Sequence, residues 1–213
     1  ELESRQPPAF RGPDAVEGAL GQPLANAAMA LNGVTHLLSS IPPASDSDPV
    51  LAAHSGDLQA IGGQLQWIGY LSTIGVYGDQ QGRWIDESCP PQPSSATSQR
   101  RLRAENQWLA FAHKIDVPVH LFRLPGIYGP GTRNQISALK AGRARRIVKP
   151  GQVFNRIHVD DIASVVMASM KLPDGSEIYN VTDDEPAPPD QVVAYAAELL
   201  GIEPPPEVPL EEA

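Results

Sequence analysis

Short apolar runs alternate with longer segments of helical periodicity along most of the chain. The apolar runs end in glycine, proline or small polar residues, which predicts strands at residues 34–40, 65–71, 117–124, 146–148 and 178–181, with an extended segment at 153–159. The periodic segments predict helices at residues 50–60, 95–114, 135–141, 160–170 and 191–200. Strands separated by helices predict an α/β fold, in which a parallel sheet is covered on both faces.

The segment from Tyr70 to Asp79, YLSTIGVYGD, has the pattern of a buried strand that ends at a binding site. Its apolar part gives way to Ser72, Thr73 and two glycines, which supply small polar groups and a flexible backbone. In an open α/β sheet, ligands bind at the carboxyl ends of the strands. The alternative, a buried strand followed by an ordinary glycine turn, stays open at this point.

Composition narrows the possible classes of function. The 213 residues are 41% hydrophobic and 19% charged, which is typical of a soluble globular protein of one domain with a small second lobe. A net charge of -9 argues against nucleic acid or an anionic membrane surface as the main partner. No apolar run approaches the roughly 20 residues of a membrane helix.

Cysteine and histidine usage points to a compartment and argues against a metal site. Cys89 is the only cysteine, so an internal disulfide is impossible and a reducing cytoplasm is expected. The five histidines are scattered without ligand spacing, and we expect no metal.

Both ends of the chain are irregular. The chain begins at Glu1, its first 33 residues contain no convincing strand, and the last ten, PPPEVPLEEA, predict neither helix nor strand. This pattern is expected of a fragment, a processed form or an incompletely observed chain. We predict a partial dinucleotide-binding domain at residues 1–130, and at residues 131–213 a mixed segment that forms a small substrate lobe and returns to the sheet.

Five segments in order resemble the extended short-chain dehydrogenases, the NAD-dependent epimerase/dehydratase family. They are STIGVYGD, SSATSQRRLRAE, LFRLPGIYGPG, RIHVDDIA and IYNVTDDEP, which together with the strand at residues 34–40 cover most of the chain. The resemblance implies a Rossmann-type doubly wound sheet that binds NAD or NADP, a small-molecule substrate, and pairing into a homodimer. The family's glycine-rich phosphate-binding turn does not occur ahead of Val34.

The resemblance also assigns catalytic positions. Thr73, four residues before Tyr77, stands where the family polarises the reacting oxygen. Counting back from Leu102 and Glu105 places the family's active-site tyrosine at Thr97 and its lysine at Arg101.

These two replacements change the chemistry that the site can perform. The pKa of a phenol can be tuned from about 10 towards neutrality, whereas an aliphatic hydroxyl such as that of Thr97 cannot reach that range. Arg101 can still hold ribose or phosphate through its fixed charge. Two roles stay open for Tyr77 and Tyr128. Either tyrosine can replace the missing acid/base, or both only line the site.

Further binding positions follow from the same resemblance. Cofactor contacts are expected at the strand ends, from Ser39, Ser40, Ile41, Ser72, Arg101, Leu124, Pro125 and Gly126. Substrate contacts are expected from Tyr77, Arg123 and Tyr128. Two functions stay open: an NAD(P)-dependent oxidoreductase, epimerase or dehydratase acting on a sugar-like or nucleotide-linked substrate, and a non-catalytic dinucleotide sensor or scaffold of the same fold.

Overall fold

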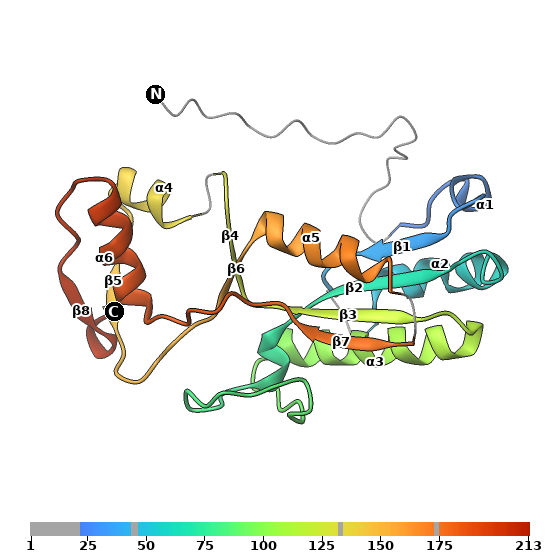
Figure 1. Cartoon of the computed structure of the whole chain (residues 1–213), viewed down its shortest axis with the longest axis horizontal. Coiled ribbons are helices and arrows are strands. Elements are labelled where there is room, and N and C mark those ends of the chain that lie inside the picture. Colours follow the sequence, from blue (N-terminus) through green and yellow to red (C-terminus); the bar gives the residue numbers. More distant parts are fainter. Residues whose placement is uncertain (1–21, 44–46, 132–133, 173–174) are drawn as a thin grey trace.

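A four-stranded parallel sheet forms the centre of the molecule (Figure 1). The computed structural model describes residues 22–43, 47–131, 134–172 and 175–213. The strand order is β1-β2-β3-β7, in which the strands span His36–Ser39, Trp67–Thr73, Val119–Leu124 and Glu177–Asn180. Both central strands are almost wholly buried, as a parallel sheet with both faces covered requires. The predicted α/β fold is therefore confirmed.

Helices cover the two faces of the sheet. The face with α2 (Pro49–Ala60) and the long α3 (Ala96–Ile115) lies opposite the face with α5 (Val159–Ser169), and α1 (Ala27–Ala30) is next to α2 (Figure 1). One core cluster joins the sheet to the first pair of helices and includes Trp108, Tyr70 and Leu58. A second cluster joins it to α5 through Trp67 and Phe122.

The helix ends follow local sequence signals. The Asp48 carboxylate accepts hydrogen bonds from the backbone amides of Val50 and Leu51 at 3.0 and 3.1 Å, and Pro49 follows it at the start of α2. Ser95 caps α3 in the same way by accepting from the amide of Ser98 at 3.1 Å. These caps agree with the starts predicted from the sequence.

A small lobe lies beyond the carboxyl ends of the strands (Figure 1). It contains α4 (Gln135–Lys140), β5 (Arg146–Val148), α6 (Pro189–Leu199), β8 (Glu207–Pro209) and the 3-10 turn η2 (Leu210–Glu212). Its core is small and consists of Leu139, Val193, Ala196 and Ala197. The strands β4 (Gly126–Tyr128) and β6 (Arg156–His158) pair in parallel between the lobe and the sheet.

Three local predictions need correction. The prediction that the last ten residues contain neither helix nor strand is wrong, because β8 pairs with β5 and η2 follows it. The strand β4 directly after Pro125 was not predicted, since its pairing partner is about thirty residues away. In the extended segment predicted at 153–159, Phe154 forms an isolated bridge to Ala187 and β6 covers three residues, but Val159 already begins α5.

The prediction for the first 33 residues can be compared with the structure only in part. Residues 1–21 lie outside the described residues. Residues 22–33 contain α1, a four-residue helix.

Candidate functional site

The carboxyl ends of β2, β3 and β7 meet at the edge of the sheet that faces the small lobe (Figure 1). Thr73 is the last residue of β2 and is paired in register with Leu124. Its side-chain oxygen accepts a hydrogen bond from the amide of Gly75 at 3.1 Å, which starts the short 3-10 helix η1 (Ile74–Tyr77). The Thr73 hydroxyl is thus held at the edge where α/β sheets bind ligands.

Arg101 is fixed beside this strand end. Its Nη1 donates to the Tyr70 hydroxyl and to the Leu71 carbonyl oxygen, both at 3.0 Å. The guanidinium carbon also lies 5.7 Å from the centre of the Tyr70 ring. Burial raises the pKa of Tyr70, although the charge of Arg101 opposes that shift, so Tyr70 keeps its proton at neutral pH. The charged Arg101 is therefore anchored to the backbone of Leu71, two residues before Thr73 in β2.

Thr97 has a different environment. It is exposed on the first turn of α3, and its hydroxyl oxygen accepts from Nη2 of Arg100 at 3.3 Å. Nothing in this arrangement gives an aliphatic hydroxyl the acidity of a phenol.

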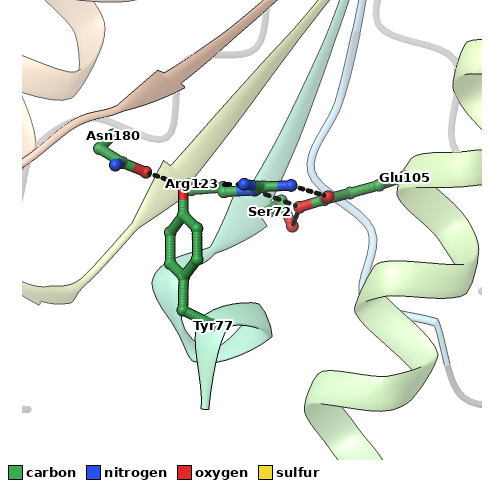
Figure 2. A network of polar contacts seen from close by, with 5 residues as sticks. All are labelled: Ser72, Tyr77, Glu105, Arg123 and Asn180. Carbon is green, nitrogen blue, oxygen red and sulfur yellow. Dashed lines mark hydrogen bonds and ion pairs between the residues drawn. The ribbon is translucent and has the colours of Figure 1, made fainter. Parts of the chain in front are cut away.

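Behind the strand ends lies a buried polar network (Figure 2). Arg123 on β3 forms two hydrogen bonds to Glu105 on α3, from Nη2 to Oε2 at 2.8 Å and from Nε to Oε1 at 3.2 Å. The side chains of Arg123 and Glu105 are only 3% and 1% exposed. Ser72 donates to the same carboxylate. Burial alone would lower the pKa of Arg123, but the hydrogen bonds and charge of Glu105, together with the contact with Tyr77, outweigh burial and raise it, so the guanidinium stays charged.

Tyr77 completes the network from η1 (Figure 2). Its hydroxyl accepts from Nη1 of Arg123 and donates to Oδ1 of Asn180, each at 2.8 Å. The Tyr77 side chain is 2% exposed, and the guanidinium of Arg123 lies 4.7 Å from its ring centre. The network therefore ties η1, α3, β3 and β7 together directly behind Thr73.

The structure thus brings Ser72, Tyr77 and Arg123 together, but with their polar atoms turned towards one another. Glu105 and Asn180, which join them, were not predicted as site residues. Glu105 carried a usable signal, because a carboxylate on the same helical face as Trp108 is expected to find a buried cation.

The remaining predicted residues lie at two further places. Ser39 ends β1 and is 4% exposed, and its hydroxyl has no hydrogen-bond partner among the described residues; Ser40 and Ile41 follow it. On the other side of Thr73, Leu124 is buried, and Pro125 leads to the exposed Gly126 at the start of β4.

Tyr128 lies at the end of β4, away from the buried network. It is 44% exposed, and its ring makes an edge contact with that of His158 at 5.2 Å. Its phenol is therefore accessible, in contrast to the phenols of Tyr70 and Tyr77.

The small lobe carries a separate cavity of about 560 Å³. It is lined by Arg146, Gln191, Ala194, Tyr195, Glu198, Ile202 and Pro204. None of these residues belongs to the set predicted from the sequence, so we place the candidate site at the strand ends instead.

The described ranges contain no group of three or more His, Cys, Asp or Glu residues placed to hold a metal ion. None of the helices there has the length and apolar character needed to cross a membrane.

A family model covers the part of the chain that builds this edge. Residues 63–182, from just before β2 to just after β7, match the model of the NAD dependent epimerase/dehydratase family. The chain belongs to this family. The resemblance inferred from the five sequence segments is therefore confirmed, and the expected nicotinamide cofactor agrees with the family's description.

Individual relatives extend the comparison. A human dTDP-D-glucose 4,6-dehydratase is 29% identical over 141 residues, which cover 62% of this chain and 39% of that protein. A structure of a conserved protein of unknown function from Silicibacter pomeroyi is 53% identical, with a TM-score of 0.79, over 86% of this chain and 63% of that one.

A second structure is that of MoeE5 in complex with UDP-glucose and NAD. It is 23% identical, over 86% of this chain and 68% of that one, and its TM-score of 0.67 shows a shared fold. The chain spans about two fifths of the length of the curated relatives that it matches.

Proposed function

We propose that this chain supplies the nicotinamide-facing and substrate-facing side of an NAD(P)-dependent site that takes a nucleotide-linked sugar. The observation that carries the proposal is that the carboxyl-terminal part of β2 ends in the Thr73 hydroxyl and also holds Arg101, through the Leu71 carbonyl oxygen. A hydroxyl there can hydrogen-bond a ligand oxygen, and a fixed guanidinium can hold ribose or phosphate.

The choice of ligand rests on the family and its relatives. The family is NAD dependent, the human relative is named for a dTDP-sugar, and MoeE5 was seen with UDP-glucose and NAD. A nucleotide-linked sugar is therefore the substrate class with most support. A homodimer and a cytoplasmic location stay predictions.

We favour dinucleotide binding over catalysis. The positions of the tyrosine side chains support the alternative of a non-catalytic dinucleotide sensor or scaffold. The position of the family's tyrosine holds Thr97. The two phenols nearest to Thr73 in the chain, those of Tyr70 and Tyr77, are buried and hydrogen-bonded within the protein. Among the tyrosines predicted as site residues, Tyr128 is the exposed one and offers its phenol from the end of β4.

Calorimetric titration with NAD, NADH, NADP and NADPH tests the proposal. We expect micromolar binding of at least one of them, and Arg101→Ala should weaken it about tenfold, as expected for a lost charge-assisted hydrogen bond. The exposed Arg143 in the small lobe gives a matched loss of charge, and Arg143→Ala should leave the affinity unchanged. The absence of heat with all four dinucleotides would contradict the proposal.

Restoring the family's residues separates the catalytic from the non-catalytic alternative. The Thr97→Tyr and Arg101→Lys double variant is tested with UDP-glucose and NAD, and conversion of the sugar is followed by NMR, with net formation of NADH measured by absorbance. Activity in the double variant alone would identify a silenced enzyme. Activity in the unmodified chain, abolished by Tyr128→Phe, would instead identify Tyr128 as the proton donor or acceptor.

A further inference from the structure

The loop of residues 79–94 joins η1 to α3 and has contacts with both the sheet and the turn that leads out of the small lobe (Figure 1). On the side of the sheet, Oε1 of Glu87 accepts a hydrogen bond at 2.6 Å from the backbone amide of Asn180, the last residue of β7. On the side of the lobe, a Cβ added at Gly82 would lie 3.6 Å from the carbonyl oxygen of Gly151, which is an ordinary contact distance. Gly151 belongs to the turn between β5 and β6. The loop therefore touches the carboxyl end of β7 and the turn that follows β5.

The hydrogen bond from Asn180 to Glu87 is made at the open edge of the sheet. β7 is the last strand in the order β1-β2-β3-β7. The next amide, that of Val181, donates to the carbonyl oxygen of Arg123 in β3 at 3.1 Å. Because successive amides of a strand point to opposite sides, the Asn180 amide points away from β3, where the sheet offers it no acceptor. The Glu87 carboxylate supplies that acceptor from a loop 93 residues away in the chain.

The side chain of Asn180 is bound from the start of the same loop. Its Oδ1 accepts from the Tyr77 hydroxyl at 2.8 Å, and Tyr77 in turn accepts from Arg123 (Figure 2). Gln80, at the beginning of the loop, donates to the Tyr77 carbonyl oxygen at 2.8 Å. Both ends of the contact therefore connect to the buried network, so the position of the loop is fixed relative to the edge at which Thr73 lies.

We propose that Glu87 is a positioning residue, which holds the 79–94 loop as a wall between the edge of the sheet and the small lobe and so orders the site for a nucleotide-linked sugar. The inference rests on the proposed function and adds a residue outside the set predicted from the sequence. β7 and β1 are the two opposite edges of the sheet, so a wall at β7 lies on the side away from the cofactor contacts expected at the end of β1. Loss of the Glu87 carboxylate should therefore weaken binding of the sugar and change dinucleotide binding less than twofold.

Calorimetric titration with UDP-glucose in the presence of NAD measures this effect. Glu87→Ala should weaken UDP-glucose binding about three- to tenfold, as expected for one lost hydrogen bond. Glu87→Gln keeps an oxygen acceptor on a side chain of the same shape, and it should restore most of the affinity. Asp86→Ala removes the neighbouring carboxylate, which bonds only to Ser88 within the loop, and it should leave the affinity unchanged. Equal affinities of the unmodified chain and Glu87→Ala would overturn the inference, as would an equal loss in Asp86→Ala.

Trp84 makes the order of the loop measurable. It lies in the loop and is 81% exposed, whereas the other two tryptophans, Trp67 and Trp108, are fully buried. Fast local motion in time-resolved fluorescence anisotropy therefore reports on Trp84, and its amplitude should increase in Glu87→Ala but not in Glu87→Gln. A larger amplitude with unchanged UDP-glucose affinity would show that Glu87 only covers the strand edge. Weaker binding with an unchanged amplitude would show that Glu87 does not act through the loop, and either result would overturn the inference.

Failure of the inference can be told apart from failure of the proposed function. If dinucleotides bind in the calorimeter, but UDP-glucose does not bind or binds Glu87→Ala equally well, the role of Glu87 is wrong and the cofactor proposal stands. If neither dinucleotides nor UDP-glucose bind to the unmodified chain, both are wrong.

Discussion

At the scale of single residues, the ion pair of Arg123 and Glu105 is the most consequential feature. Removing two charges from water costs several kcal/mol each, and only their close pairing and the added bonds from Ser72 and Tyr77 offset this cost. Such a pair holds the strand ends in one arrangement.

Removing one partner of this pair should be severely destabilising. We expect Arg123→Met to lower the free energy of unfolding by about 3–5 kcal/mol, because it leaves Glu105 charged and buried. The Arg123→Met and Glu105→Leu double variant should lose less than the single variant. Urea unfolding measures both. Arg146 pairs with Glu207, which is 59% exposed, so Arg146→Ala should cost less than about 1 kcal/mol.

His120 should make the stability depend on pH. It is fully buried between Trp67 and Tyr179, and its Nε2 donates to the Gly175 carbonyl oxygen at 3.1 Å. Burial lowers the pKa of His120, although the bond to Gly175 and the charge of Glu177 oppose the shift. The folded state therefore takes up this proton less readily than the unfolded state.

Stability should fall as the pH drops below about 6.5, where the unfolded histidine becomes protonated, by at most about 1.4 kcal/mol per pH unit. His120→Gln should remove this part of the slope in urea unfolding measured between pH 5 and 8, whereas a change at the exposed His113 should not. A slope that is the same in His120→Gln and the unmodified chain would show that other groups cause it.

At the scale of elements, Gly78 controls how the chain leaves η1. Its φ of +73° lies in the left-handed region, and a Cβ there would lie 2.1 Å from the Gln92 carbonyl oxygen. The long loop that follows therefore depends on a glycine at this position to return towards α3.

Two glycine substitutions should have opposite effects. Gly78→Ala should destabilise the protein by more than about 1 kcal/mol, because the backbone is strained and a methyl group collides with Gln92. Gly56 lies inside α2 with open space where a Cβ would stand, so Gly56→Ala should stabilise by about 0.5–1 kcal/mol. Thermal unfolding measures both, and equal effects would contradict this account of Gly78.

At the scale of the whole molecule, the sheet and the small lobe have cores of very different size. The cluster around Trp108 and Tyr70 contains large aromatic and aliphatic side chains. The buried core of the lobe consists of Leu139, Val193 and two alanines. Because buried apolar area drives folding, the lobe should open at a lower free energy than the sheet.

Amide hydrogen exchange should detect this difference. We expect α6 to exchange faster than β2 and β3, and Val193→Ala should accelerate exchange in α4 and α6 alone. Val119→Ala, a matched truncation in the fully buried β3, should accelerate exchange across the sheet and α3. Equal acceleration of both regions by Val193→Ala would show that the lobe and the sheet unfold as one unit.

Elements with strong local signals were predictable from the sequence. The helices after Asp48 and Ser95 begin where capping residues stand, and the buried strands at residues 67–73 and 119–124 consist mainly of apolar residues. The three-residue strands β4 and β8 were missed because they exist only through pairing with β6 and β5.

The sequence by itself determined the α/β fold, the family and the placement of Thr73 at a strand end, because periodicity and ordered motifs are local properties of the chain. Only the tertiary structure decided that the polar atoms of Tyr77 and Arg123 face each other behind the strand ends, and that Ser98 lies beside Thr73. Those contacts join residues 25 to 46 positions apart in the chain. Hydrogen-bond partners at such separations are chosen by packing, which no local pattern records.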